Sequence, residues 1–178
     1  HPKRHAWIDK TMEAIQRDFL PSDLTRVYKQ LNIEGCVAVQ VDQTKEETTF
    51  LLALAEQHDF IRGVVGWVDL GAPILERQLE YYKDYPKLCG FRHIVQSEAD
   101  PLFLLRDKFL KGISKLAQYG YTYDILIFPH QLGTALELVK LFPNQKFIID
   151  HIAKPYIKAG FIESWAVQMK AIAKYEYV

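Results

Sequence analysis

Long apolar runs are missing from this sequence. No run approaches the roughly 20 residues needed to cross a bilayer. The start His1-Pro2-Lys3-Arg4-His5 lacks the apolar core of a signal peptide. We therefore expect a soluble, cytoplasmic protein without a membrane partner.

An excess of one charge is missing too. Lys plus Arg number 22, and Asp plus Glu also number 22. No stretch concentrates basic residues into the stripe that a nucleic-acid binder uses, so nucleic acid is not an expected partner.

Cysteine is scarce. Cys36 and Cys89 each sit inside an apolar run that looks like a buried strand, where a thiol serves as a small hydrophobe. This argues against a disulfide framework or a zinc knot. The sequence also has no Ser-centred elbow, no phosphate-cradling glycine loop and no paired Cys motif. A serine hydrolase, a P-loop enzyme and a zinc finger therefore lack support.

Five short runs rich in β-branched and aromatic residues predict strands. They are continuous rather than alternating, which is typical of strands buried on both faces. The runs are Gly35–Val41, Ile61–Leu70, Leu88–Gln96, Tyr121–Phe128 and Phe147–Ile152.

Segments with helical periodicity separate these runs, and Pro21-Ser22-Asp23 and Gly71-Ala72-Pro73 are good helix starts. Asn32, Gly120 and Pro143-Asn144 follow the predicted helix ends. Successive strands begin about 25 to 33 residues apart, close to the length of a right-handed βαβ unit. The sequence thus predicts one α/β domain over residues 1–178, with a parallel sheet covered by helices.

The length leaves two architectures open. A (β/α)8 TIM barrel needs about 250 residues, and five strands with a final helix at Phe161–Lys174 account for only part of one. Tyr175–Val178 is a point where another strand could begin. The chain is either a shorter open sheet or part of a longer barrel.

Parallel sheets bind ligands outside the carboxyl ends of their strands, so polar residues there are candidates for a site. The third run brings Arg92, His93 and Gln96 close together. Arg92 and Gln96 share one face of the strand and His93 points to the other. These residues form either a substrate site or a hydrogen-bonded strand-end cluster.

The last predicted strand leads from an apolar run into Asp150, His151 and Lys154, before Pro155. An imidazole beside a carboxylate can take a proton from water, and a nearby ammonium can stabilise a developing negative charge. This is the strongest local signal of catalysis in the chain.

Other polar residues near the strand ends are weaker candidates. Asp124 is the only acidic residue in its run, where an unpaired carboxylate would be costly. It either binds a metal, orients a catalytic group or caps its neighbours. Gln40, Trp67 and Asp69 either add walls and hydrogen bonds to a pocket or pack in the core or at the rim.

Taken together, four segments resemble the amidohydrolase-2 branch of the amidohydrolase superfamily, especially its sugar-lactonase-like members of the L-rhamnono- and L-fucono-lactonase type. The resemblance covers nearly the whole chain, and the motifs follow the family's order. The segments are Phe19–Leu24, Gly63–Leu70, Gly90–Gln96 and Asp150–Pro155.

The resemblance implies a distorted TIM barrel that hydrolyses esters, lactones or amides, with some decarboxylases, often through water activated by a divalent metal. It implies that His151 binds or activates groups at the reaction centre. It also implies that Arg92, His93 and Gln96 line the substrate site. The chain would correspond to strands two to six of the barrel.

The sequence departs from the family at both ends. The family's His-x-His metal motif would lie just before His1, and its final-strand Asp beyond Val178. His1 and His5 lie in a polar segment and are assigned no catalytic role. Zinc or manganese therefore remains an expectation, with Asp124 and His151 as candidate ligands.

The leading hypothesis is hydrolysis of a small sugar lactone by water activated near His151. Asp150 and Asp124 would orient or assist, while Lys154 and Arg92 would stabilise the oxyanion or bind the substrate. The alternatives are a superfamily decarboxylase or amide hydrolase, and a non-catalytic fragment that binds sugar lactones or acids. An incomplete barrel would also expose strand edges, so we expect the isolated chain to aggregate or form homo-oligomers.

Overall fold

Strands and helices alternate along the chain, as the sequence predicts. The computed structural model describes residues 8–178, so His1 and His5 lie outside the described residues. All five predicted strands are present, each shorter than its apolar run because the run continues into a loop. They are β1 (Cys36–Val39), β2 (Ile61–Gly66), β3 (Leu88–His93), β4 (Thr122–Ile125) and β5 (Phe147–Ile149).

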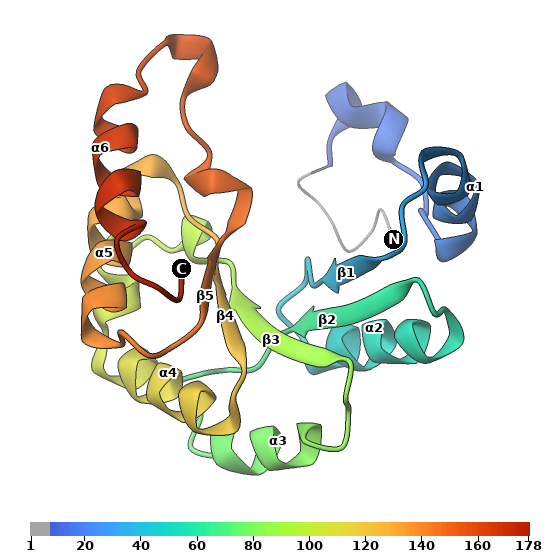
Figure 1. Cartoon of the computed structure of the whole chain (residues 1–178), viewed down its shortest axis with the longest axis horizontal. Coiled ribbons are helices and arrows are strands. Elements are labelled where there is room, and N and C mark those ends of the chain that lie inside the picture. The colour runs from blue at the N-terminus through green and yellow to red at the C-terminus, as the bar shows by residue number, and fades with distance from the viewer. Residues whose placement is uncertain (1–7) are drawn as a thin grey trace.

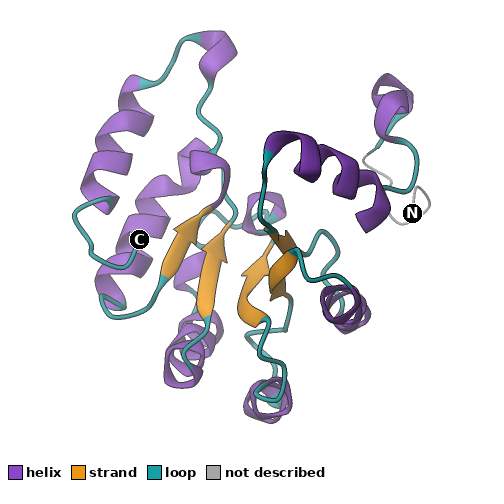
Figure 2. Cartoon of the chain, turned by 45° about the vertical axis from the view of Figure 1, so that its right-hand side comes forward, coloured by secondary structure: helices purple, strands orange, loops and turns teal. Residues whose placement is uncertain are grey.

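The five strands form one parallel sheet in the order β1-β2-β3-β4-β5. Each strand therefore pairs with the next strand in the sequence, and a crossover joins each pair. The sheet curls into half of a barrel, with the helices on its outer side (Figures 1 and 2). The parallel βαβ architecture is confirmed.

Six α-helices accompany the strands within the described residues. They are α1 (Pro21–Leu31), α2 (Lys45–Gln57), α3 (Leu75–Tyr82), α4 (Asp107–Tyr119), α5 (Leu132–Leu141) and α6 (Glu163–Ile172). Short 3₁₀ turns complete the loops: η1 (Lys10–Ile15), η2 (Val95–Ser97), η3 (Phe103–Leu105), η4 (Pro129–Gln131), η5 (Asp150–Ala153) and η6 (Ile157–Ala159).

The helix ends follow local chemistry. At the start of α1, the backbone N–H of Leu20 donates to Oδ2 of Asp23 over 2.8 Å, and Pro21 needs no N–H partner. Asn32 ends α1 with a φ of 53°, and Gly120 ends α4 with a φ of 74°. Both residues adopt the left-handed conformation that commonly closes a helix.

The hydrophobic core lies between the outer face of the sheet and the helices. Phe91 on β3 contacts Tyr82 of α3, and Tyr123 on β4 contacts Phe109 of α4, with ring centroids 5.7 and 5.5 Å apart. Their burial holds the helices against the strands. The core also includes Val64, Leu79, Ile113, Leu116, Ile125 and Leu138.

The inner face of the sheet is open, which corrects one prediction. Val37 and Ile148 are 51% and 47% exposed, and Cys89 is also exposed. Burial on both faces was therefore wrong for these positions, because residues alternate across a strand and the helices cover only one face. On the inner face, Arg92 and Asp124 are buried near the carboxyl ends of their strands. Cys36 is half-buried, so neither thiol is a fully buried hydrophobe. Self-association stays a prediction for sedimentation to test.

Tyr177 lies against the edge of β5, where its carbonyl accepts a hydrogen bond from the N–H of Phe147 over 2.7 Å. The structure assigns no strand there. No helix within residues 8–178 is both long enough and apolar enough to span a membrane.

Candidate active site

The carboxyl ends of the strands bring most of the predicted site residues together. Arg92 on β3 is in register with Asp124 on β4, which is in register with Ile148 on β5. Asp150 follows two residues after Ile148. The parallel pairing therefore brings together, at the carboxyl ends of the strands, side chains that are distant in the sequence.

Arg92 lies at the centre of this group. Its side chain is 7% exposed, and its Nη1 donates to Oδ2 of Asp150 over 2.6 Å. Its Nη2 donates to the carbonyl of Gln40, while Nε2 of Gln40 donates back to the carbonyl of Arg92 over 2.9 Å. Gln40 itself is fully buried. A reciprocal pair of bonds thus joins the end of β1 to β3, and Asp150 fixes the guanidinium from the other side.

Buried polar atoms next to this ion pair are left without partners. Oε1 of Gln40, Nε of Arg92 and Oδ1 of Asp124 have none among the described residues. Such atoms are uncommon in protein interiors and need an explanation. Here they lie at the edge of the sheet where parallel folds bind ligands.

Asp124 is a buried carboxyl close to other charges, with 3% of its surface exposed. Burial raises the pKa of Asp124 to about 7, with the negative charge of Asp150 adding to the effect and Arg92 opposing it. Asp124 can therefore hold or release a proton near neutral pH, while Asp150 is bound to a guanidinium. Opposed environments of this kind separate acid from base in active sites.

His151 and Lys154 lie on a turn directly after β5. Lys154 donates through Nζ to Oε1 of Gln96, and its Nζ lies 5.2 Å from the ring centroid of Phe128. Burial lowers the pKa of Lys154, as does the positive charge of Arg92, while Asp150 opposes the shift. His151 is exposed. Asp150, which precedes His151 in the sequence, is bound to Arg92 and therefore orients the Arg92 guanidinium.

His93 is engaged by the protein through both ring nitrogens. Nε1 of Trp67 donates to Nδ1 of His93 over 3.4 Å, and Nε2 of His93 lies 2.7 Å from Oε1 of Glu98. The imidazole also stacks on Phe103, with centroids 4.8 Å apart. His93 and Trp67 therefore meet, but the histidine has no nitrogen free for a ligand in this arrangement. Asp69 is exposed and accepts from the N–H of Gly71 in a turn.

Sequence reasoning missed three residues of this region. Oε1 of Gln43 accepts from the N–H of Ile94 over 2.7 Å, and Phe128 lies under the ammonium of Lys154. Glu98 fixes His93. Gln43 and Phe128 lie at or just after strand ends, so the rule that selected Gln40 could have found them. Glu98 lies beyond a 3₁₀ turn and gives no comparable signal.

The described residues do not by themselves form a metal site. Within residues 8–178, no three His, Cys, Asp or Glu side chains are placed to hold a metal ion. The unpartnered Oδ1 of Asp124 would suit a metal ligand, but Arg92 in the neighbouring strand already supplies a positive charge beside it. Asp124 and His151, the two expected ligands, are therefore too few to hold a metal ion.

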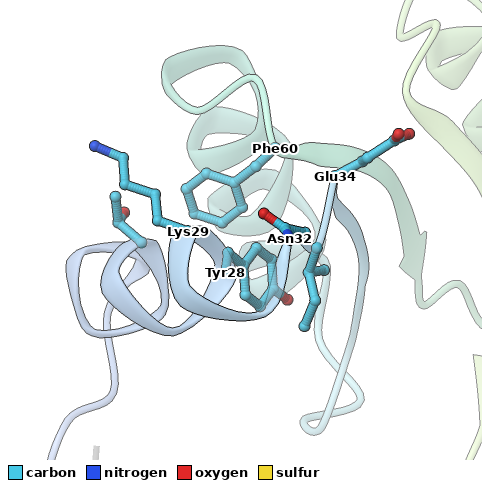
Figure 3. Close-up of a pocket in the computed structure, with 7 residues that line it drawn as sticks. Tyr28, Lys29, Asn32, Glu34 and Phe60 are labelled. Carbon is cyan, nitrogen blue, oxygen red and sulfur yellow. The ribbon is translucent and has the colours of Figure 1, made fainter.

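A separate cavity of about 530 Å³ lies near the amino ends of β1 and β2, away from the candidate site (Figure 3). Tyr28 and Phe60 line it and contact each other edge to face, with centroids 5.4 Å apart. Glu34 and Phe60 precede β1 and β2, so the cavity lies at the amino ends of the strands. Ligand sites of parallel sheets form at the other end, and this cavity is not part of the candidate site.

Comparison with known proteins places the chain in a family. A family model described as amidohydrolase matches residues 10–178. The chain belongs to the amidohydrolase family. An amidohydrolase from Burkholderia multivorans solved with bound HEPES superimposes with a TM-score of 0.94 at 30% identity, covering 100% of this chain and 64% of that one. A second crystal form with bound zinc gives a TM-score of 0.93 at 32% identity, covering 100% of this chain and 63% of that one.

Two curated relatives are similar to this amidohydrolase chain in sequence. The L-fucono-1,5-lactonase of Burkholderia ambifaria is 32% identical over 172 residues, which is 97% of this chain and 59% of the relative. The L-fucono-1,5-lactonase of Burkholderia multivorans is 35% identical over 152 residues, 85% of this chain and 51% of the relative. The chain thus spans little more than half the length of these relatives.

Proposed function

We propose that this amidohydrolase chain forms part of the active site of an enzyme that opens a small sugar lactone. The observation that carries the proposal is the convergence of Arg92 and Lys154, both held by protein partners, on the strand ends beside His151. The lactonases of the two Burkholderia species support the substrate class.

In the proposed reaction, water attacks the carbonyl carbon of the lactone and the bond to the ring oxygen breaks. His151 takes a proton from the attacking water. The negative charge that develops on the carbonyl oxygen is stabilised by Lys154 and Arg92. The proton that His151 took from the water passes to the ring oxygen as its bond to the carbonyl carbon breaks, so the product is the open-chain hydroxy acid.

The remaining residues hold this arrangement in place. Asp150 and Gln40 fix the Arg92 guanidinium, while Gln96 fixes the Lys154 ammonium. Gln96 also has the amide chemistry to bind sugar hydroxyls. Trp67 and His93 contribute through their mutual hydrogen bond, with Trp67 as an apolar wall of the site.

Asp124 supplies a proton store in this proposal. Its carboxyl is buried, has an unpartnered oxygen and has its pKa raised to about 7, so it can gain or lose a proton near neutral pH. A zinc or manganese ion would need ligands beyond Asp124 and His151 from outside the described residues. Elemental analysis of the purified protein tests that expectation.

The experiment for the proposed function is product analysis with a panel of sugar 1,5-lactones, using the intact protein as its host makes it. Release of the hydroxy acid faster than the uncatalysed rate supports the lactonase. Release of carbon dioxide would favour a decarboxylase, and release of an amine would favour an amide hydrolase. Binding of lactone without turnover, with and without added metal, would favour a binding protein.

A further inference from the structure

The turn that carries His151 and Lys154 has an unusual backbone. His151, Ile152, Ala153 and Lys154 have φ values of 51°, 49°, 55° and 51°, so four consecutive residues are left-handed. None of them is glycine, and side chains disfavour this conformation. The β-branched Ile152 is the least suited of the four. Strain of this kind persists only where the surroundings hold it, and it concentrates at functional sites.

Contacts within the turn and from α6 hold it in place. The N–H of Lys154 donates to the carbonyl of His151 over 2.9 Å, and the side chain of Ala153 is fully buried. Nε1 of Trp165 donates to the carbonyl of Ile152 over 2.7 Å. Trp165 comes from α6, which follows the turn in the chain and lies beside α5 (Figure 1).

The bond from Trp165 acts on the backbone of the strained turn rather than on a side chain. The side chain of Ile152 is 54% exposed, so its packing adds little to hold the turn. Its carbonyl is the atom that the neighbouring helix binds. Loss of that bond would let the turn relax, which would draw Lys154 away from Gln96.

We propose that Trp165 is a positioning residue for the candidate active site. Its indole N–H holds the left-handed turn and thereby presents His151 and Lys154 at the strand ends. This role rests on the proposed function, since His151 and Lys154 act on the substrate there. Trp165 itself acts only through the turn.

The test starts with Trp165→Phe, which keeps an aromatic ring but removes the donor. A misplaced catalytic group lowers the turnover number, so we expect lactone hydrolysis to fall about 10-fold to 100-fold. Adding Ile152→Gly should recover most of the lost rate, because glycine adopts a positive φ at little cost. Ile152→Ala is the matched control. It also removes most of the exposed side chain but keeps the Cβ that makes a positive φ costly, so it should rescue far less than glycine does.

A second readout does not depend on activity. In ¹⁵N NMR of the same variants, Trp165→Phe should shift the amide signals of Ala153 and Lys154, and Ile152→Gly should return the Lys154 signal toward its original position. Parent-like amide signals in Trp165→Phe would overturn the proposal. So would equal rescue by Ile152→Gly and Ile152→Ala. If the parent hydrolyses no lactone, the proposed function fails, and the NMR comparison alone decides the role of Trp165.

Discussion

Oδ2 of Asp150 lies 2.6 Å from Nη1 of Arg92, and this contact joins residues 58 positions apart in the chain. The two side chains are 13% and 7% exposed, so the pair is shielded from water. Removing one partner of a buried pair leaves the other charge uncompensated. The contact therefore couples the geometry of the candidate site to the stability of the fold.

Asp150→Ala should lower the free energy of unfolding by about 3 to 5 kcal/mol, because it leaves the Arg92 guanidinium buried and unpaired. Urea denaturation measures the change. Glu137→Ala is the control, since Glu137 pairs with Lys140 on an exposed helix face and should cost less than about 1 kcal/mol. Similar small losses in both variants would show that Arg92 is not held by Asp150.

The buried carboxyl of Asp124 should make the stability of the protein depend on pH. Its pKa is raised by burial from 3.8 to about 7, so the folded state binds a proton more tightly than the unfolded chain does. The stabilisation from this group is complete below the unfolded pKa and is lost as the pH rises toward 7. Between the unfolded pKa and pH 7, we expect this group to lower the free energy of unfolding by about 3 to 4 kcal/mol.

The measurement is urea denaturation of the parent and of Asp124→Asn at pH 5 and pH 7.5. The parent should lose more stability than the variant over this interval, because asparagine does not titrate. The same pH dependence in both proteins would mean that Asp124 ionises normally in the fold.

Two helical glycines provide a test of the packing. A Cβ on Gly112 of α4 would lie 2.4 Å from the carbonyl oxygen of Leu70, whereas the nearest atom to a Cβ on Gly133 of α5 is 3.4 Å away. Gly112→Ala should therefore destabilise the protein by about 1 to 3 kcal/mol. Gly133→Ala should stabilise it by up to about 1 kcal/mol, because alanine favours helix. Thermal unfolding of both variants compares them, and stabilisation by Gly112→Ala would contradict the close approach of α4 to Leu70.

Lys154→Met tests the ammonium beside Gln96 while preserving much of the side-chain length. Losing a group that stabilises the oxyanion should lower kcat about 10²-fold to 10³-fold. Steady-state kinetics on the preferred lactone measures the loss. Lys158→Met, four residues later on an exposed turn, is the matched control and should keep parent-like rates. A higher KM with an unchanged kcat would assign Lys154 to substrate binding alone.

The architecture was predictable because the apolar runs, their spacing and the helix-ending residues Asn32 and Gly120 all indicate the same βαβ pattern. The open inner face was not. An apolar run such as Leu88–Gln96 predicts burial, but it does not say whether a partner covers each face. Val37 and Ile148 are exposed because the helices cover only the other side.

The sequence indicated which polar residues lie at the strand ends better than it indicated their contacts. The strand-end rule selected Arg92, Asp124 and Asp150, but only the fold reveals that Asp150 binds Arg92. It likewise reveals that His93 binds Trp67 and Glu98. The left-handed turn gave no signal, because positive φ is expected at glycine and none of its residues is glycine.

In the proposed reaction His151 accepts a proton during lactone opening, so the rate of His151→Ala is the decisive measurement. The intact protein and its variant are compared on the preferred sugar lactone, after subtraction of the uncatalysed rate. His58→Ala, at the amino end of β2, serves as the control. A loss of about 10²-fold to 10⁴-fold in His151→Ala alone is the predicted result. Hydrolysis by His151→Ala at the parent rate would show that His151 does not accept that proton.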